Sequence, residues 1–181
     1  INKYYFKEDN ERIDEMIQEK NLTNENEIKS FRLEQNVYKK NKKGNPQVYI
    51  YDIKSNGITS VKNSLKIAID KLILKIKFIQ SEVKIKSDTV FILPSEKNPK
   101  IQVMTCINEN NTLGNLFSYY CSSHNLLDSC SFLIPHPLKN ELLIKFIFKK
   151  ETETTKENCV LIINETSEKL IKLLEEFKAF F

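Results

Sequence analysis

Cys121, His124 and Asp128 are the residues whose types and spacing come nearest to a nucleophilic site. Cys121 and His124 would lie on one face of a helix, because residues three positions apart are neighbours there. A histidine that takes the proton of a cysteine thiol creates a reactive thiolate. However, no glycine-bounded nucleophile turn lies nearby. We therefore expect Cys121 to pack inside a helix and His124 to lie near its carboxyl end, where positive charge is favourable.

His136 is a second candidate, as a metal ligand. It stands between Pro135 and Pro137, and no second ligand follows at the spacing of a zinc site. The two prolines hold the backbone extended and remove two N–H donors, which ends a strand without leaving unpaired ladder groups. We predict that residues 135–137 form a rigid structural corner.

The cysteines and glycines point to no other chemistry. The four cysteines, Cys106, Cys121, Cys130 and Cys159, contain no C-x-x-C pair, and we expect all of them to be reduced thiols. The sequence has neither a phosphate-binding loop nor a dinucleotide-binding glycine pattern. It therefore predicts no metal and no cofactor.

The charge pattern limits the partners of the chain. The net charge is +4, and 26 of the 28 cationic residues are lysine. Arginine supplies the fork that reads base edges, so we expect little direct DNA contact. The run at residues 39–43 could bind nucleic acid or act as a localisation signal, but a solvated loop is the favoured interpretation. No apolar run approaches the roughly 20 residues that span a bilayer, so no membrane partner is expected. Because the chain begins at Ile1, we expect a fragment of a longer protein.

The longest periodic segment, residues 59–83, is predicted to be one helix. Its apolar positions advance by threes and fours and include Leu65, Leu72 and Ile76. A helix of about 25 residues would be about 37 Å long, too long for one small domain to cover its apolar stripe. We expect this helix to dock against a partner as well.

Shorter patterns predict the remaining elements. In the first half we expect a short amphipathic helix at 10–20, a polar loop, and strands at 30–38 and 47–55. In the second half we expect strands at 89–93, 100–107, 129–134 and 141–149, and helices at 112–124 and 165–181. The alternation within 141–149 is that of a sheet covered on one face.

Asn111-Thr112-Leu113-Gly114-Asn115 is typical of a turn that leads into a helix. Asn111 or Thr112 is expected to cap the first turn. The apolar residues that follow, Leu113, Leu116, Phe117 and Tyr120, share one helical face. Glycine at position 114 costs about 1 kcal/mol relative to alanine. We expect its missing Cβ to let another backbone approach closely.

This motif, together with Ile134-Pro135-His136-Pro137-Leu138, resembles the small α-like subunit of multisubunit RNA polymerases, the eleventh-subunit type in eukaryotic polymerase II. That family carries His-Thr-Leu-Gly-Asn ahead of its dimerisation helix and Pro-His-Pro after the next strand. The resemblance covers residues 90–181. It departs at Asn111, where the family has His, and at Cys130-Ser131, where Gly-Tyr is common.

The resemblance implies an α+β fold in which a mixed or antiparallel sheet is covered by long helices on one face, like the N-terminal domain of the bacterial α subunit. It implies a non-catalytic assembly subunit of a DNA-directed RNA polymerase, with a second α-like unit and the large catalytic subunits as partners. On this interpretation the subunit interface comprises Thr112, Leu113, Gly114, Asn115, Leu116, Phe117, Tyr120, Leu65, Leu72 and Ile76.

A second resemblance concerns residues 47–83. The segments Tyr49-Ile50-Tyr51-Asp52-Ile53 and Ala68-Ile69-Asp70-Lys71-Leu72 look like the C-terminal end of the larger α-like subunit, the third-subunit type. The chain would then divide into the C-terminal part of a larger α-like unit, residues 1–87, and a small dimerisation domain, residues 88–181. Such fusions occur among large DNA viruses that transcribe in the cytoplasm. A viral protein would act in the cytoplasm or virion, and a cellular one in the nucleus.

Two other classes of function remain open at this point. An unrelated α+β binding module, for example a homodimer, would also explain the apolar helices, with residues 111–115 as a coincidental helix start. A thiol enzyme built on Cys121 and His124 is the least favoured interpretation.

Overall fold

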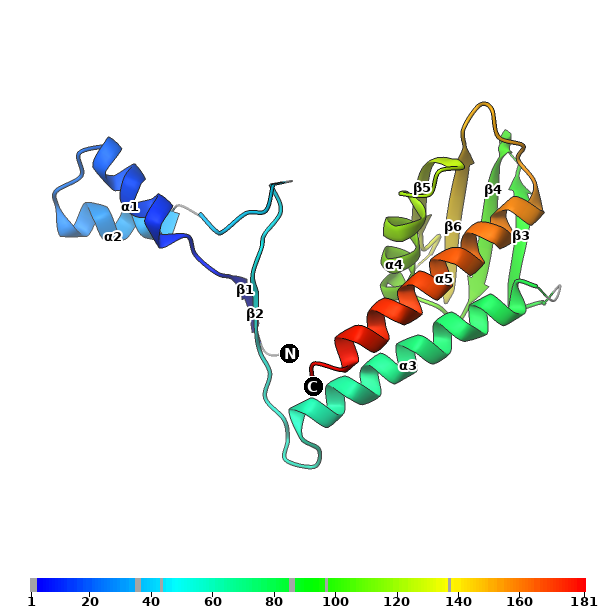
Figure 1. The fold of residues 1–181 in the computed structure, drawn as a ribbon, viewed down its shortest axis with the longest axis horizontal. Helices are drawn as coiled ribbons and strands as arrows, with labels where there is room; N and C mark the ends of the chain where they lie inside the picture. The colour runs from blue at the N-terminus through cyan, green and yellow to red at the C-terminus, as the bar shows by residue number, and fades with distance from the viewer. Residues whose placement is uncertain (1–2, 35–36, 43, 85–86, 97, 137) are drawn as a thin grey trace. The chain divides into compact units, whose positions relative to one another are not determined.

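The computed structural model describes residues 3–34, 37–42, 44–84, 87–96, 98–136 and 138–181. The chain divides into two compact units, Ile1–Val61 and Lys62–Phe181, and each is described by itself. Figure 1 shows the elements in chain order. The predicted boundary at residue 87 differs from this division, because the long helix packs within the second unit. The assignment of residues 1–87 to a larger α-like unit is a statement about family membership, and it stays a prediction.

The first unit contains a two-stranded antiparallel ribbon, β1 (Lys3–Phe6) and β2 (Tyr49–Asp52). Two helices, α1 (Asn10–Glu19) and α2 (Glu25–Glu34), lie between these strands in the sequence. The predicted helix at 10–20 is confirmed, whereas the strand at 30–38 is wrong over residues 30–34, which belong to α2. Asn24 starts α2 by accepting a hydrogen bond from the backbone N–H of Asn26 at 3.0 Å. An ion pair between Arg32 and Asp14 joins the two helices.

The second unit is built on a four-stranded sheet. Its strands are β3 (Val90–Ser95), β4 (Asn98–Ile107), β5 (Leu127–Leu133) and β6 (Glu141–Phe148). They lie in the order β3-β4-β6-β5, and every neighbouring pair is antiparallel. The predicted α+β class is confirmed, and the sheet is the antiparallel one of the two alternatives.

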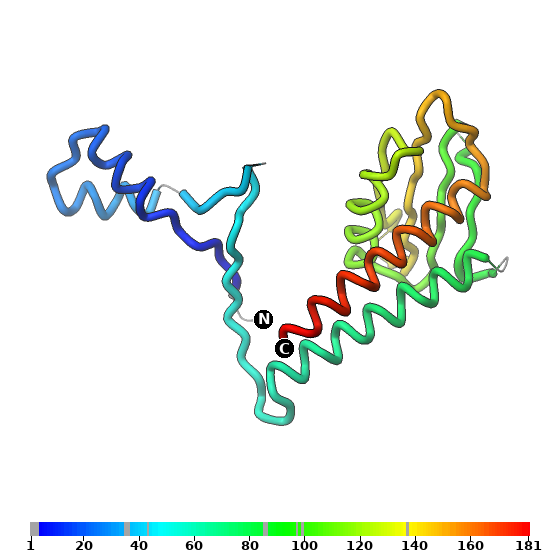
Figure 2. The backbone as a smooth tube through the Cα atoms, in the orientation of Figure 1, coloured from blue at the N-terminus to red at the C-terminus, as the bar shows by residue number. Residues whose placement is uncertain are grey.

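Three helices cover one face of this sheet: α3 (Val61–Glu82), α4 (Asn111–Cys121) and α5 (Lys156–Lys178) (Figure 1). Along β6 the side chains of Leu142, Ile144 and Phe146 are fully buried beneath them, while Leu143 and Lys145 on the other face are only half-buried. The one-sided alternation therefore places the core between sheet and helices. Figure 2 shows α3 and α5 running side by side along the sheet.

The long helix α3 confirms the prediction at 59–83, but α5 begins nine residues before the predicted start at 165. Thr155 caps α5 by accepting a hydrogen bond from the backbone N–H of Asn158 at 3.2 Å. The apolar run from Cys159 to Ile163 has no clear helical period, which explains why its helical conformation was not predicted. Among the described residues, no helix combines the length and apolarity that crossing a bilayer requires.

Candidate assembly interface

The N-cap of helix α4 lies before both residues that were predicted to cap it. Asn110, in extended backbone conformation, is the N-cap, and its side-chain oxygen accepts a hydrogen bond from the backbone N–H of Thr112 at 3.0 Å. The prediction that Asn111 or Thr112 caps the helix is therefore wrong. The cap is nevertheless of the expected kind, because an Asn side chain accepts a hydrogen bond from an otherwise unpaired N–H group of the first turn.

Gly114 permits a close approach, but within its own domain. A Cβ at this position would lie 2.8 Å from the Leu142 Cδ1 atom and 2.8 Å from the Phe132 Cγ atom. Real Cβ atoms essentially never have such short contacts. The neighbours that need the space are thus side chains of β5 and β6. The expectation that another backbone approaches Gly114, as part of a subunit contact, is wrong for this structure.

Some of the predicted interface residues are buried in the core of the second unit, and the others are at least partly exposed. Leu113, Phe117 and Ile76 are at most 1% exposed and, like Gly114, lie inside the second unit. They cannot form the centre of a contact with another chain, which corrects that part of the prediction. The other predicted interface residues keep exposed area: Thr112 and Asn115 are exposed, and Leu65, Leu72, Leu116 and Tyr120 are half-buried. Their role as an interface stays a prediction.

An open apolar groove lies where α3, α4 and α5 meet. It has a volume of about 470 Å³. Its lining combines apolar side chains of all three helices with a few polar ones at the rim: Leu65, Ala68, Ile69, Lys71, Leu72, Lys75, Asn110, Thr112, Leu113, Leu174 and Phe177. Four of the predicted interface residues, Leu65, Leu72, Thr112 and Leu113, therefore come together around one cavity.

Two ion pairs brace the helices around this groove. The Lys178 Nζ atom lies 2.6 Å and 2.7 Å from the two carboxylate oxygens of Asp70, joining α5 to α3. The Lys75 Nζ atom lies 2.7 Å from the Glu109 Oε2 atom, joining α3 to the turn before α4. Ion pairs as well as apolar packing therefore connect the helices that line the groove.

The outward side of α3 carries further apolar area that the sequence analysis did not single out. Ile67, Leu74 and Phe78 are 50%, 65% and 47% exposed. They are spaced by seven and four residues, so they share one face of the helix. Phe177 of α5 is 50% exposed beside the groove. Exposed large apolar side chains that share one helical face favour a site of protein association. The sequence does contain a signal for this surface, because residues 61–82 have more apolar residues than a single apolar face of one helix needs.

Cys121, His124 and Asp128 do not form a nucleophilic site. Cys121 is fully buried, and its thiol lies 3.4 Å from the Thr166 hydroxyl oxygen. The His124 Nε2 atom instead lies 3.0 Å from the Glu165 carboxylate, and its Nδ1 atom accepts a hydrogen bond from the backbone N–H of Leu126. Here His124 follows the end of α4, as predicted, and ties that end to α5. A substrate would have no access to the thiol.

The other cysteines are also buried. Burial raises the pKa of Cys106 to about 12 and the pKa of Cys159 to about 12. The pKa of Cys130 is raised as well, first because its thiol donates a hydrogen bond to Cys121 and then because of burial. These thiols are held in the neutral form, which is the unreactive one.

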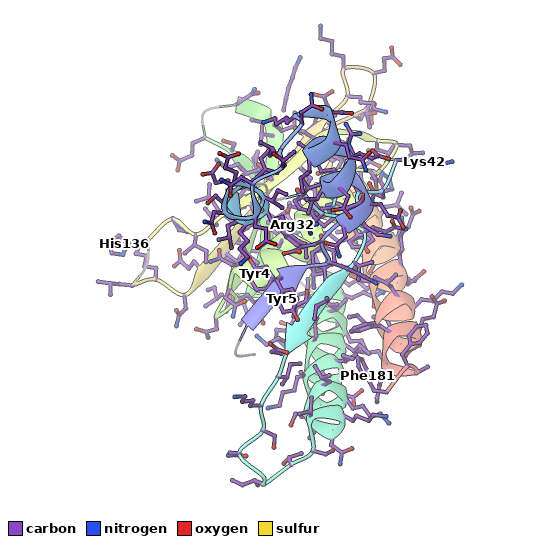
Figure 3. The ribbon with its side chains drawn as sticks, turned by 90° about the vertical axis from the view of Figure 1, so that its left-hand side faces the viewer. Tyr4, Tyr5, Arg32, Lys42, His136 and Phe181 are labelled. Carbon is purple, nitrogen blue, oxygen red and sulfur yellow. The ribbon has the colours of Figure 1, made fainter. Side chains whose placement is uncertain are left out.

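His136 is exposed and lies on the turn that connects β5 to β6 (Figure 3). Its Nδ1 atom accepts a hydrogen bond from the backbone N–H of Leu138 at 3.1 Å, and its carbonyl accepts one from Lys139. Pro135 is exposed, and Pro137 lies outside the described residues. Within the part of the chain that the structure describes, no group of histidine, cysteine or acidic side chains could hold a metal ion.

Comparison with known families gives one match, which lies within the second unit. Residues 102–179 match the family model described as the RNA polymerase Rpb3/Rpb11 dimerisation domain. The matched segment, a little under half of the chain, runs from β4 to the last residues of α5 and contains all of α4. No curated protein matches the chain. The antiparallel sheet covered by helices agrees with this class of domain.

Proposed function

We propose that this chain is a non-catalytic assembly subunit of a DNA-directed RNA polymerase. Its second unit pairs with another α-like unit, and the pair forms a platform on which the large catalytic subunits assemble. The observation that carries the proposal is that the apolar groove and the matched segment share the same helices. The helices α4 and α5 that border the apolar groove lie inside the segment that matches a polymerase dimerisation domain.

The proposed pairing depends on burial of apolar surface. An obligate interface buries more than about 2,000 Å² and has the composition of a protein core. Leu65, Leu72 and Phe177 around the groove, with Leu74 and Phe78 on the outward side of α3, supply apolar area of that kind. Each such side chain contributes part of the about 1.5–3 kcal/mol that full burial from water gives, because it is already partly covered in the chain.

We further propose that α3 is the C-terminal helix of a larger α-like unit joined to the small one. The packing of α3 supports this proposal. Ile69, Ile73, Ile76 and Ile79 are buried in the same core as α4 and α5, although the matched segment begins only at residue 102. A helix from outside the dimerisation segment thus completes its core. The viral origin that such a fusion would suggest remains part of the proposal.

The test is purification of the tagged full chain from the cells that produce it, followed by identification of the proteins that copurify. We expect the large subunits of an RNA polymerase and a second α-like unit in fixed proportion. A chain that elutes as a monomer, or as a homodimer free of polymerase subunits, would contradict the proposal and favour an unrelated binding module. Retained transcription by a Cys121→Ala variant would dispose of a thiol mechanism built on that residue.

A further inference from the structure

The β1–β2 ribbon presents a ladder of aromatic rings on one face. Tyr4 lies directly opposite Tyr51, and Phe6 lies opposite Tyr49, so these four side chains share a face. The ring centroids of Tyr4 and Tyr51 are 6.3 Å apart, and those of Phe6 and Tyr49 are 5.2 Å apart. Tyr38 extends the ladder, with its ring 5.0 Å from Phe6. We call these five residues the aromatic ladder.

The ladder is more exposed than stabilisation of a ribbon requires. Tyr4, Tyr49 and Tyr51 are 62%, 49% and 52% exposed. Cross-strand aromatic pairs do stabilise short ribbons, but side chains that serve only this purpose gain most when they are covered. Three half-exposed tyrosines on four-residue strands therefore leave ring surface that a flat ligand could cover.

Lysines gather at one end of the ladder. Lys40 places its Nζ atom 5.2 Å from the centre of the Tyr38 ring. The backbone of Lys39 pairs with both Lys7 and Gln47, which attaches this lysine segment to residues that flank the two strands. Lys42 is exposed and projects outward from the next turn (Figure 3). Residues 3–7 and 37–54 contain seven lysines and a single acidic residue, Asp52, whereas residues 8–34 are predominantly acidic.

We propose that the aromatic ladder and its lysines bind single-stranded nucleic acid without sequence preference. Exposed bases stack on Tyr4, Tyr49 and Tyr51, and the cations of Lys40 and Lys42 lie along the phosphates. Stacking platforms beside a cationic track are the usual means of binding a single strand. The scarcity of arginine does not oppose this role, because stacking needs no readout of base edges. The excess of cations beside the rings favours a polyanion over a neutral or basic partner.

The binding test measures fluorescence anisotropy of a labelled oligothymidine and a labelled oligouridine of about 12 nucleotides, a length within the range of such sites. The full chain is titrated into each probe and into a duplex of equal length. We expect saturable binding of both single strands and clearly weaker binding of the duplex. Because the chain contains no tryptophan, quenching of its tyrosine emission reports stacking directly.

Variants separate the two components of the site. Tyr49→Ala with Tyr51→Ala should weaken binding at least about tenfold, whereas Tyr51→Phe should bind like the parent chain. Tyr119→Ala, at a position 74% exposed on α4, is the matched control. Exchange of Lys40 and Lys42 for glutamine leaves the rings in place. It should remove a slope of about −1.4 from the plot of log affinity against log salt, since each phosphate on a single strand contributes about −0.7.

Three results would overturn the proposal. These are no binding of either oligonucleotide by the parent chain, equal binding by the double alanine variant, and equal binding of the duplex. Should the double alanine variant unfold the ribbon, the salt slope of the glutamine variant decides the matter. A protein that is captured on the ladder without any oligonucleotide shift would assign the surface to protein docking and likewise overturn it.

Discussion

Asp70 of α3 and Lys178 of α5 form an ion pair across 108 positions of sequence, with the ammonium held by both carboxylate oxygens at 2.6 Å and 2.7 Å. Their side chains are 48% and 35% exposed, so water screens much of the attraction. The pair fixes the far end of α5 against α3, beside the apolar groove. Its contribution to the stability of the fold should therefore be small.

This pair makes a first prediction. Asp70→Asn or Lys178→Met should lower the free energy of unfolding by only about 0.5–1 kcal/mol, because exposed ion pairs contribute little. The coupling between the two changes, measured by urea unfolding of both single variants and the double variant, should shrink at high salt. Lys172→Met, on the exposed side of the same helix, is the control. A coupling of several kcal/mol would contradict this account.

Gly114 makes a second prediction. Gly114→Ala should destabilise the second unit by about 1–3 kcal/mol through overpacking, although alanine is the better helix former by about 1 kcal/mol. The Cβ would meet the Phe132 ring and Leu142. Adding Phe132→Leu should restore part of the loss, since it frees the space that the Cβ needs. The measurement is thermal or urea unfolding of Gly114→Ala, Phe132→Leu and the double variant. If the double variant loses the sum of the two single losses, the packing explanation is wrong.

Gly114 also illustrates what the sequence can and cannot predict. A glycine in the first turn of a helix indicates a close neighbour, and that indication was right. The identity of the neighbour depends on how β5 and β6 pass beneath α4, which no local pattern encodes. The burial of Leu113 and Phe117 within their own domain could not be predicted for the same reason: they share a helical face, but periodicity does not say whether that face meets its own sheet or another chain.

Strong periodicity succeeded where weak signals failed. The spacing of Leu65, Leu72 and Ile76 predicted α3, and the alternation of Leu142, Ile144 and Phe146 predicted β6. Helix α2 was missed because Phe31 is its only buried residue among those described, so its apolar stripe is very thin. The groove itself requires side chains from three helices, and its volume could not be predicted from any one of them.

The groove makes a third prediction. Leu72→Glu should abolish copurification with polymerase subunits, because a carboxylate would have to be buried without a partner in the interface. The isolated chain should lose little stability, since Leu72 is only half-buried there. Leu138→Glu, at a position 88% exposed on the turn before β6, is the matched control and should leave copurification unchanged. Quantitative mass spectrometry of the purified complexes is the measurement.

If Leu72→Glu and Leu138→Glu both retain the full complement of subunits, the groove is not the contact. If both lose it, the effect comes from added charge rather than from position.

The buried thiols make a fourth prediction about alkaline pH. The pKa values of Cys106 and Cys159 are about 12 in the folded chain, against an ordinary value of 9.0 that applies when the chain unfolds. Above about pH 9 only the unfolded form releases these protons, so stability falls as pH rises toward 12. The loss should be up to about 1.4 kcal/mol per pH unit for each thiol.

Urea unfolding at several pH values measures this slope, and Cys106→Ala should reduce it by about half of the contribution from these two cysteines. The same burial predicts that iodoacetamide modifies the folded chain slowly at pH 8 and the unfolded chain fast. Rapid modification of Cys121 in the folded chain would contradict its burial and reopen the thiol hypothesis.

Photocrosslinking from position 177 tests the central claim most directly. Phe177 lines the groove, is 50% exposed, and can be replaced by a benzoyl derivative of phenylalanine that preserves its aromatic ring. Irradiation of the full chain in the cells that produce it should yield a crosslink to another α-like unit or a large subunit of an RNA polymerase. Crosslinks confined to this chain itself, or formed only with proteins unrelated to transcription, would contradict the account.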